Sequence, residues 1–278
     1  MIRKTVLKKT SKISLKKTKD IALSIQFSLD GFSFCVIDTV TQEKIYFTEY
    51  QFAETLNSPE DLLSKIELIF KGNANLQLDY NSVTVLHQNN LYTLVPSSYF
   101  DEGSLATYLN FNIKTLNTDF IAFDEITAID AKNVYIPYIN INNYLFQNFG
   151  EFEYKHHISV LIEKLLKIES LKEKTMYVNV YKNSFDIIVI EDKKIIISNS
   201  FLYHSKEDFI YYILFTAEQI QLNTEEFNLY FMGEIATDSD IFKITYTYIK
   251  NIFFLESQNA IFEDLEASNH SNFTLLSS

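Results

Sequence analysis

The segment "SIQFSLDGFSFCVID", residues 24–38, has the pattern of two strands joined by a tight turn. Apolar side chains recur on both sides of Asp30-Gly31, and Asp-Gly is a frequent pair at β-hairpin turns. The segment "VNVYKNSFDIIVIE", residues 178–191, repeats this pattern about 150 residues later. With an offset of 153, its apolar positions match in order: Ile25, Phe27, Phe32, Phe34, Val36 and Ile37 fall on Val178, Val180, Phe185, Ile187, Val189 and Ile190. The chain therefore contains the same strand-turn-strand unit twice.

The elements around each unit are also predicted in the same order. Three strands are followed by a helix and then by a fourth strand, and each helix begins at a serine cap, Ser58 or Ser205, followed by acidic residues that favour a helix N-terminus. In the first half the predicted ranges are 22–28, 32–38, 43–50, 58–70 and 82–87. In the second half they are 176–182, 185–191, 194–200, 205–222 and 227–232. This order predicts a duplicated α/β domain.

The two halves differ after the fourth strand. The second half continues at once with a helix near 239–250 and a short strand from 252, whereas the first half has an insertion, residues 88–139. The insertion is predicted to hold two or three strands and a short helix near 104–110; a helix, a strand and another helix follow it. We therefore expect a first lobe over residues 20–157 and a second lobe with a C-terminal tail over residues 158–278.

Composition supports a folded, two-domain protein. Of the 278 residues, 47% are hydrophobic and 15% are aromatic, which is enough material for two well-filled cores. No apolar run approaches the ~20 residues that span a bilayer, and no signal-peptide pattern follows the first charges, so a cytoplasmic location is expected. The single cysteine, Cys35, lies in a predicted strand, where it is expected to be a buried apolar side chain. One cysteine excludes an intramolecular disulfide and a two-cysteine metal site.

Charge is distributed unevenly along the chain. Residues 1–19 hold eight of the 24 basic residues and no acidic one, and the rest of the chain carries 36 acidic residues. An acidic body repels nucleic acids and anionic membranes, so neither is an expected partner. We expect residues 1–19 to be a flexible, solvated leader; the alternative is an arm that binds RNA or a membrane.

The architecture resembles a known fold. Three strands followed by alternating helices and strands, present twice with an insertion in one copy, is similar to the actin-like ATPase (ribonuclease H-like) fold of actin, sugar kinases and Hsp70 chaperones. The segment "LYTLVPSSYFDEGSLATYLNFN", residues 91–112, most resembles a bacterial family of unknown function known from Bacteroidetes. Actin-like proteins of pilus assembly and type II secretion are also similar. The resemblance implies two lobes around a cleft and a site for ATP with Mg²⁺.

The resemblance also indicates which residues would hold a nucleotide. The first phosphate turn would contain Asp30 and Gly31, the second would contain Asn183 and Ser184, and Gly233 would lie beside adenine and ribose. This sequence departs from the family pattern at all three places. Ser28 stands where the family has its strand-end acid, the second turn "YKNS" has neither acid nor glycine, and Glu234 replaces the second glycine after the fourth strand.

These departures favour a pseudo-ATPase over an enzyme. A Mg²⁺-nucleotide site needs carboxylates and backbone donors that are positioned together. We therefore expect a non-catalytic binding or scaffolding protein with no cofactor and an unknown protein partner. The alternative is a weak ATPase or small-molecule kinase that uses ATP with Mg²⁺ in an eroded site between the lobes.

Three further features have competing interpretations. His156-His157 adjoins an acid, but adjacent histidines point in different directions and no metal-binding spacing supports them, so we expect no metal site. The aromatic segments at 209–215 and 244–256 fit core packing or, alternatively, a partner or homodimer surface. The late apolar cluster at 273–276 either docks on the body or serves as a peptide ligand.

Overall fold

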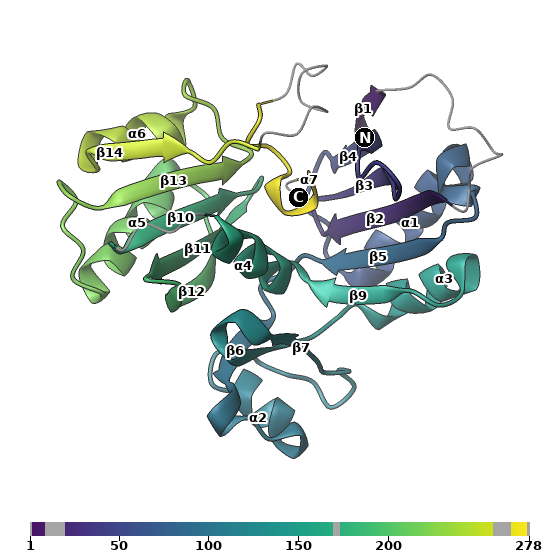
Figure 1. Ribbon diagram of the computed structural model, residues 1–278, viewed down its shortest axis with the longest axis horizontal. Helices are drawn as coiled ribbons and strands as arrows, with labels where there is room; N and C mark the ends of the chain where they lie inside the picture. Colours follow the sequence, from purple (N-terminus) through teal and green to yellow (C-terminus); the bar gives the residue numbers. More distant parts are fainter. Residues whose placement is uncertain (1, 9–19, 169–172, 258–267, 277–278) are drawn as a thin grey trace. The chain divides into compact units, whose positions relative to one another are not determined.

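A computed structural model describes residues 2–8, 20–168, 173–257 and 268–276 (Figure 1). The chain divides into two compact units, and the boundary falls inside helix α4 (His157–Lys167), between Leu161 and Ile162. The sequence placed the corresponding boundary four residues earlier, between 157 and 158.

The first unit contains two sheets. The larger has the strand order β1-β4-β3-β2-β5-β9 and the smaller has the order β6-β8-β7. Their bounds are β1 Ile2–Lys8, β2 Ile21–Ser28, β3 Gly31–Asp38, β4 Lys44–Phe52, β5 Ser82–His87, β6 Tyr92–Pro96, β7 Ala122–Ile126, β8 Ala131–Tyr135 and β9 Glu153–His156. The helices outside the boundary helix are α1 Pro59–Gly72, α2 Leu105–Leu109 and α3 Ile139–Phe149, with 3₁₀ turns η2 Ala74–Gln77, η3 Ser97–Tyr99, η4 Glu102–Ser104 and η5 Thr127–Ile129.

The second unit contains one sheet with the order β12-β11-β10-β13-β14. Its strands are β10 Thr175–Val180, β11 Ser184–Glu191, β12 Lys194–Leu202, β13 Asn228–Gly233 and β14 Asn251–Phe254. Its helices are α5 Lys206–Gln219, α6 Asp240–Tyr248 and α7 Phe273–Leu276.

The duplication is confirmed strand by strand. In both units an antiparallel meander supplies three strands, and the first strand of the meander also pairs in parallel with the fourth, β2 with β5 and β10 with β13. Each meander has a register irregularity, between Val36 and Ile37 in one and between Val189 and Ile190 in the other. These positions coincide under the offset of 153 taken from the sequence. The two halves thus share an irregularity as well as a strand order.

The predicted helix caps are present. The side chain of Ser58 accepts a hydrogen bond from the Asp61 N–H at the start of α1. Ser205 and Asp208 form a reciprocal capping box at the start of α5. Each cap satisfies backbone donors that would otherwise be unpaired at the helix N-terminus. The two caps therefore fix the residue at which the helix after each meander begins.

Each unit has its own apolar core. In the first, Leu62, Ile66 and Phe70 of α1 pack on the sheet residues Phe32 and Phe34. In the second, Phe209 and Ile213 of α5 pack with Val178, Phe185 and Phe231. Burial of a side chain of this size contributes about 1.5–3 kcal/mol relative to exposure. Burial of these helix side chains against the sheet therefore contributes to the stability of each unit.

The insertion forms the three-stranded sheet with α2. Val95, Leu109, Val134 and Ile136 form its small core. The prediction of strands and one short helix between residues 88 and 139 is confirmed.

The predicted flexible leader is wrong for residues 2–8. This segment forms β1, which pairs antiparallel with β4 from Ile2 opposite Phe52 to Lys8 opposite Tyr46. β1 lies at the edge of the sheet, where charged residues such as Arg3 are common. Residues 9–19, the rest of the predicted leader, lie outside the described residues.

Candidate functional site

The first predicted phosphate turn is held by its own unit. The turn residues between β2 and β3 are Leu29 and Asp30. The Asp30 carboxylate accepts a hydrogen bond from the Thr55 hydroxyl at 2.5 Å. The Asp30 and Leu29 carbonyls accept from the Phe52 and Leu56 N–H groups, both at 2.9 Å. The loop after β4 therefore binds both the carboxylate and the backbone of this turn.

Gly31 is required by a close approach within the sheet. The two central turn residues, Leu29 and Asp30, do not have positive φ values, so the turn is not the type I′ hairpin that Asp-Gly often forms. A Cβ atom at this position would lie 2.8 Å from the carbonyl oxygen of Tyr50 in β4. The glycine at position 31 is thus explained by the contact between β3 and β4 without a ligand.

The second predicted phosphate turn directs carbonyl groups towards a tyrosine. The Tyr203 hydroxyl donates to the Tyr181 carbonyl at 2.9 Å and lies 3.1 Å from the Lys182 carbonyl. The Asn183 carbonyl accepts from the Tyr203 N–H, and the Ser184 carbonyl accepts from the Tyr181 N–H. Phosphate binding needs N–H groups that converge on the ligand. In this turn, carbonyl groups converge on the Tyr203 hydroxyl.

The side chain of Tyr181 belongs to a polar network on the sheet. Its hydroxyl accepts from Asn179 Nδ2 at 2.6 Å and donates to Asp186 Oδ2 at 2.9 Å. The Ser200 hydroxyl donates to the other oxygen of Asp186, which is 2% exposed. The buried carboxylate of this unit is therefore satisfied by neighbouring strands.

Gly233 is the most constrained of the predicted site residues. It ends β13 opposite Val180 with a φ of +87°, a conformation that side-chain-bearing residues rarely adopt. A Cβ atom here would lie 2.2 Å from the Val180 carbonyl oxygen and 2.8 Å from Asn179 Oδ1. The end of β10 therefore occupies the space that the glycine leaves.

The C-terminal segment, residues 268–276, binds at the same place. The Gly233 N–H donates to the His270 carbonyl at 2.8 Å. The His270 ring stacks on Phe254 at a centroid distance of 4.4 Å, and its Nε2 lies 2.7 Å from the Ile235 carbonyl. Burial lowers the pKa of His270. This segment uses a backbone donor that the family resemblance assigned to the nucleotide region.

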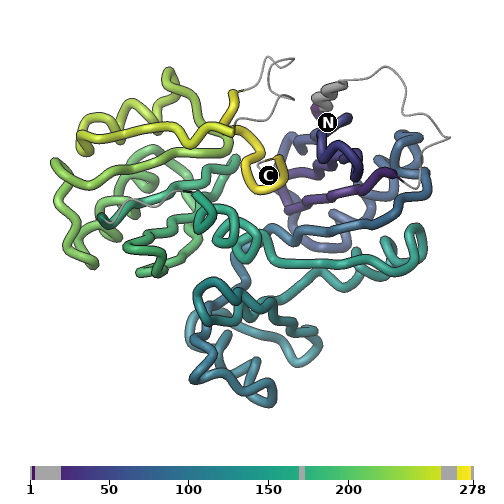
Figure 2. The backbone as a smooth tube through the Cα atoms, in the orientation of Figure 1, coloured from purple at the N-terminus to yellow at the C-terminus, as the bar shows by residue number. Residues whose placement is uncertain are grey.

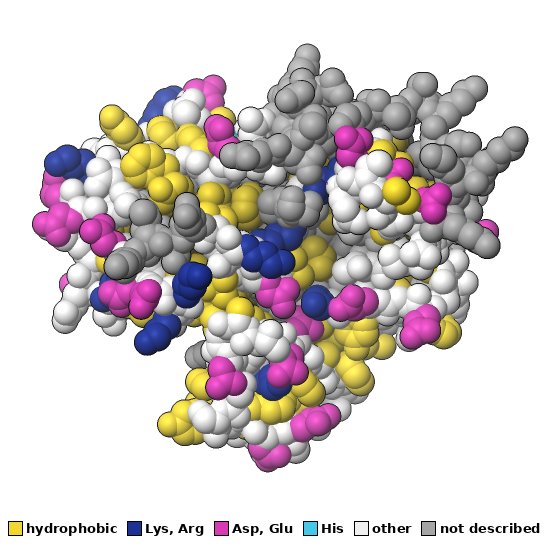
Figure 3. Space-filling view, viewed as in Figure 1, with side chains coloured by type: hydrophobic (Ala, Val, Ile, Leu, Met, Phe, Trp, Pro, Cys, Tyr) yellow, Lys and Arg dark blue, Asp and Glu magenta, His cyan; other side chains and the backbone are white. Residues whose placement is uncertain are grey.

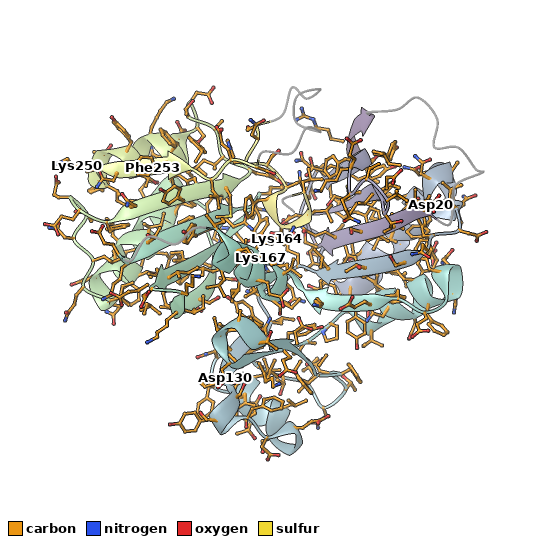
Figure 4. All side chains as sticks on the ribbon, viewed as in Figure 1. Asp20, Asp130, Lys164, Lys167, Lys250 and Phe253 are labelled. Carbon is orange, nitrogen blue, oxygen red and sulfur yellow. The ribbon has the colours of Figure 1, made fainter. Side chains whose placement is uncertain are left out.

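Helix α7 lies in the same C-terminal segment, which is the yellow end of the tube in Figure 2. Its residues Phe273, Thr274, Leu275 and Leu276 are all buried. Lys164 of α4, labelled in Figure 4, donates to the Thr274 carbonyl at 2.7 Å, and Asn179 Nδ2 lies 3.4 Å from the Thr274 hydroxyl. Of the two interpretations of the apolar cluster at 273–276, docking on the body is confirmed.

A second polar cluster, which the sequence did not predict, lies in the first unit. His87, at the end of β5, is fully buried; its Nε2 lies 2.9 Å from Asn142 Oδ1, and its Nδ1 accepts from the Tyr138 N–H. These two contacts fit the neutral imidazole with its proton on Nε2. Burial lowers the pKa of His87 to about 4. The ring is therefore held in a neutral, structural state.

His156 joins the insertion to the larger sheet. Its Nε2 lies 3.1 Å from the Asn89 carbonyl, and Asn133 Nδ2 lies 3.2 Å from its Nδ1. Burial lowers the pKa of His156 well below its ordinary value. The neighbouring His157 contacts the His87 carbonyl at 3.3 Å. Within the described ranges, no group of three His, Cys, Asp or Glu side chains is arranged to hold a metal ion.

Asp124 of β7 is the acceptor at the centre of this cluster. Its Oδ2 accepts from the His156 N–H at 2.8 Å and from the Ser159 hydroxyl at 2.5 Å, and its Oδ1 accepts from the Tyr135 hydroxyl at 3.1 Å. Burial raises the pKa of this carboxyl, although all three hydrogen bonds oppose the shift. Asp124 thereby ties β7 of the insertion to β9 and α4.

The sequence matches the model of a protein family of unknown function, DUF3822, over residues 10–252. The chain belongs to the DUF3822 family. No curated protein matches the sequence. This assignment supports the resemblance to a family of unknown function that the sequence suggested.

Solved structures show the fold of this DUF3822 protein. A Bacteroides thetaiotaomicron protein with an actin-like ATPase fold and unknown function has a TM-score of 0.80 at 22% identity, covering 88% of this chain and 94% of its own. The PilM-PilN type IV pilus biogenesis complex gives a TM-score of 0.60 at 11% identity, covering 91% of this chain and 96% of the matched chain. The DUF3822 protein thus has the actin-like ATPase fold. Within the described part of the chain, no helix is long and apolar enough to cross a membrane.

The predicted nucleotide-binding residues of this DUF3822 protein make contacts within their own units. The carboxylate of Asp30 is bound by Thr55, the second turn directs carbonyls towards Tyr203, and the Gly233 N–H is bound by His270. A phosphate site needs several backbone donors and a carboxylate that are available together. Each predicted site residue lies in a turn or at a strand end, as expected, and each contacts residues of its own unit.

Proposed function

We propose that this DUF3822 protein is a cytoplasmic, actin-like binding or scaffolding protein that works without binding or hydrolysing ATP. The observation that carries the proposal is the hydrogen bond from the Gly233 N–H to the His270 carbonyl at 2.8 Å. This hydrogen bond places the chain's own C-terminal segment at the end of β13, and the residues of α7 in the same segment are buried. A nucleotide would have to displace this packed segment from its hydrogen bonds.

The partner in this proposal is another protein. The PilM-PilN complex shows that a chain of similar fold can assemble with a second protein. The formal net charge of −12 opposes binding to nucleic acids or anionic membranes. Figure 3 shows magenta carboxylates on several parts of the face that it draws, interspersed with dark-blue cations. Such a surface suits a protein partner better than a polyanion.

Isothermal titration of ATP with Mg²⁺ into the full-length protein tests the proposal. We expect no saturable binding at about 1 mM nucleotide, the upper end of ordinary substrate constants. Phosphate release should equal that of a buffer blank.

A matched pair of variants makes the test specific. Asp30→Asn removes the one carboxylate at the first turn, and Asp192→Asn makes the same change at an exposed turn between β11 and β12. Saturable nucleotide binding or phosphate release that Asp30→Asn abolishes and Asp192→Asn preserves would overturn the proposal in favour of a weak ATPase or kinase.

A further inference from the structure

The insertion presents exposed apolar side chains in the segments that flank α2 (Figure 1). Tyr99 and Phe111 are 77% and 80% exposed, and Leu116 and Phe120 are 60% and 53% exposed. The small core of the insertion is formed by other side chains. Large apolar side chains that gather in one part of a surface are typical of sites that bind other molecules. The segment that carries them, residues 99–120, is named the insertion tip.

Hydrogen bonds hold the backbone of the insertion tip in place. The Tyr108 hydroxyl, from α2, donates to the Tyr99 carbonyl at 2.7 Å and accepts from the Asp101 N–H at 2.8 Å. The Leu116 N–H donates to the Asp119 carboxylate at 2.8 Å, and the Asp119 N–H donates to the Leu116 carbonyl at 3.0 Å. Defined turns therefore present the exposed side chains. A surface that is ordered beforehand loses less conformational entropy when it binds a partner.

The insertion is also acidic. Asp101 and Glu102 of the insertion tip are exposed. The whole insertion, residues 88–139, has six acidic residues and two basic ones, so its net charge is −4. Figure 3 shows magenta carboxylates and yellow apolar side chains side by side on the insertion, at the bottom of the view. This charge repels nucleic acids, anionic membranes and the same surface of a second copy, and it complements a cationic protein segment.

One lysine of the insertion shows how this combination of groups holds a cation. Lys132 Nζ, on β8, lies 2.5 Å from Glu125 Oε1 and 5.9 Å from the centre of the Phe100 ring. A carboxylate and the face of an aromatic ring both attract a cation, because each presents negative charge to it. The insertion tip exposes the same two kinds of group, in the side chains of Tyr99, Asp101, Glu102, Phe111 and Phe120.

We propose that the insertion tip binds a segment of a partner protein that is rich in lysine or arginine and also carries apolar side chains. The cations of this segment lie against the exposed carboxylates and aromatic rings, and its apolar side chains cover Leu116. Burial of the aromatic rings supplies affinity, and the carboxylates supply selectivity for a cationic partner. This inference rests on the proposed binding function and adds to it the surface and the chemistry of the partner.

A library of random peptides displayed on phage, selected on the full-length protein, tests the proposal. Selected peptides should be rich in lysine, arginine and apolar residues and poor in acidic residues. One selected peptide is then labelled with fluorescein, and its binding is followed by fluorescence anisotropy. Phe111→Ser with Leu116→Ser should weaken its binding about tenfold or more, as expected for two interface anchors. Val40→Ser with Tyr246→Ser makes similar changes at residues that are 74% and 68% exposed elsewhere, and should leave binding unchanged.

Charge reversal gives a second readout with the same peptide. Glu102→Lys should weaken binding and reduce its dependence on salt concentration, because it removes an attraction that salt screens. Glu218→Lys makes the same change at an exposed position of α5 and is the matched control.

Several outcomes would overturn the proposal. They are the absence of enriched peptides, the enrichment of acidic peptides, and peptide binding that the two serines at positions 111 and 116 leave unchanged. If these serines instead abolish binding to phosphatidylglycerol vesicles, or self-association measured by sedimentation equilibrium, the surface belongs to a membrane or to a second copy. None of these measurements depends on whether nucleotide binds, so failure here is distinct from failure of the proposed function.

Discussion

Two glycines at predicted nucleotide positions have contacts within the protein. A Cβ atom would lie 2.8 Å from the Tyr50 carbonyl at Gly31 and 2.2 Å from the Val180 carbonyl at Gly233. The sequence identified both residues and placed them at strand ends, because strand patterns are local. It did not predict their partners, since Tyr50 and Val180 are distant in sequence and only the sheet brings them close. The same holds for Thr55 beside Asp30 and for His270 beside Gly233.

Gly233→Ala should destabilise the protein by about 2 kcal/mol or more, since it adds a Cβ at a positive φ against a backbone carbonyl. Urea unfolding followed by circular dichroism measures the loss. Gly72→Ala, at the last residue of α1, is the control. No atom lies within 4 Å of its Cβ position, and alanine has a higher helix propensity than glycine. Equal stability of both variants would show that the end of β10 moves away freely.

At the level of elements, the sequence predicted the order of strands and helices in both halves. Alternation and capping signals are local, so they identified the meanders, α1 and α5 to within a few residues. β1 was not predicted, because its lysines look like part of a continuous charged leader and its pairing with β4 is a long-range contact. The polar cluster around Asp124 was also missed. Its members come from β7, β8, β9 and α4, and no spacing along the chain marks them as neighbours.

Asp124→Ala should release the insertion from the rest of the first unit. The change leaves the His156 N–H and the hydroxyls of Ser159 and Tyr135 without their acceptor, at a cost of about 3 kcal/mol. Limited proteolysis with mass spectrometry should then show early cleavage between residues 88 and 139. Asp130→Asn should leave cleavage unchanged, since Asp130 has a φ of +50° that asparagine tolerates. Cleavage that starts elsewhere in the Asp124→Ala variant would contradict an anchoring role.

For the molecule as a whole, duplication explains the strand order that the two units share. Segments added to each unit explain how the two units differ. The first unit carries β1 and the inserted sheet, and the second carries the docked C-terminal segment. Each addition covers polar backbone or binds a strand end that the bare repeat would leave exposed. Within the actin-like repeat, the positions expected to bind nucleotide make contacts inside the protein.

The buried histidines make the stability of the folded chain sensitive to acid. His87 has a pKa of about 4 in the folded state against 6.5 in an unfolded chain, so its contribution to stability is complete above pH 6.5 and is lost as pH falls through 4. The full shift corresponds to about 3 kcal/mol, and the lowered pKa of His156 acts in the same direction. The urea midpoint should therefore fall between pH 7 and pH 4.5. His87→Gln should lower the midpoint at pH 7 but reduce its dependence on pH, because glutamine does not titrate. Leu86→Ala, in the same strand, is the control: it lowers the midpoint by creating a cavity and should retain the full pH dependence. If both variants show the same pH dependence, protonation of His87 does not limit acid stability.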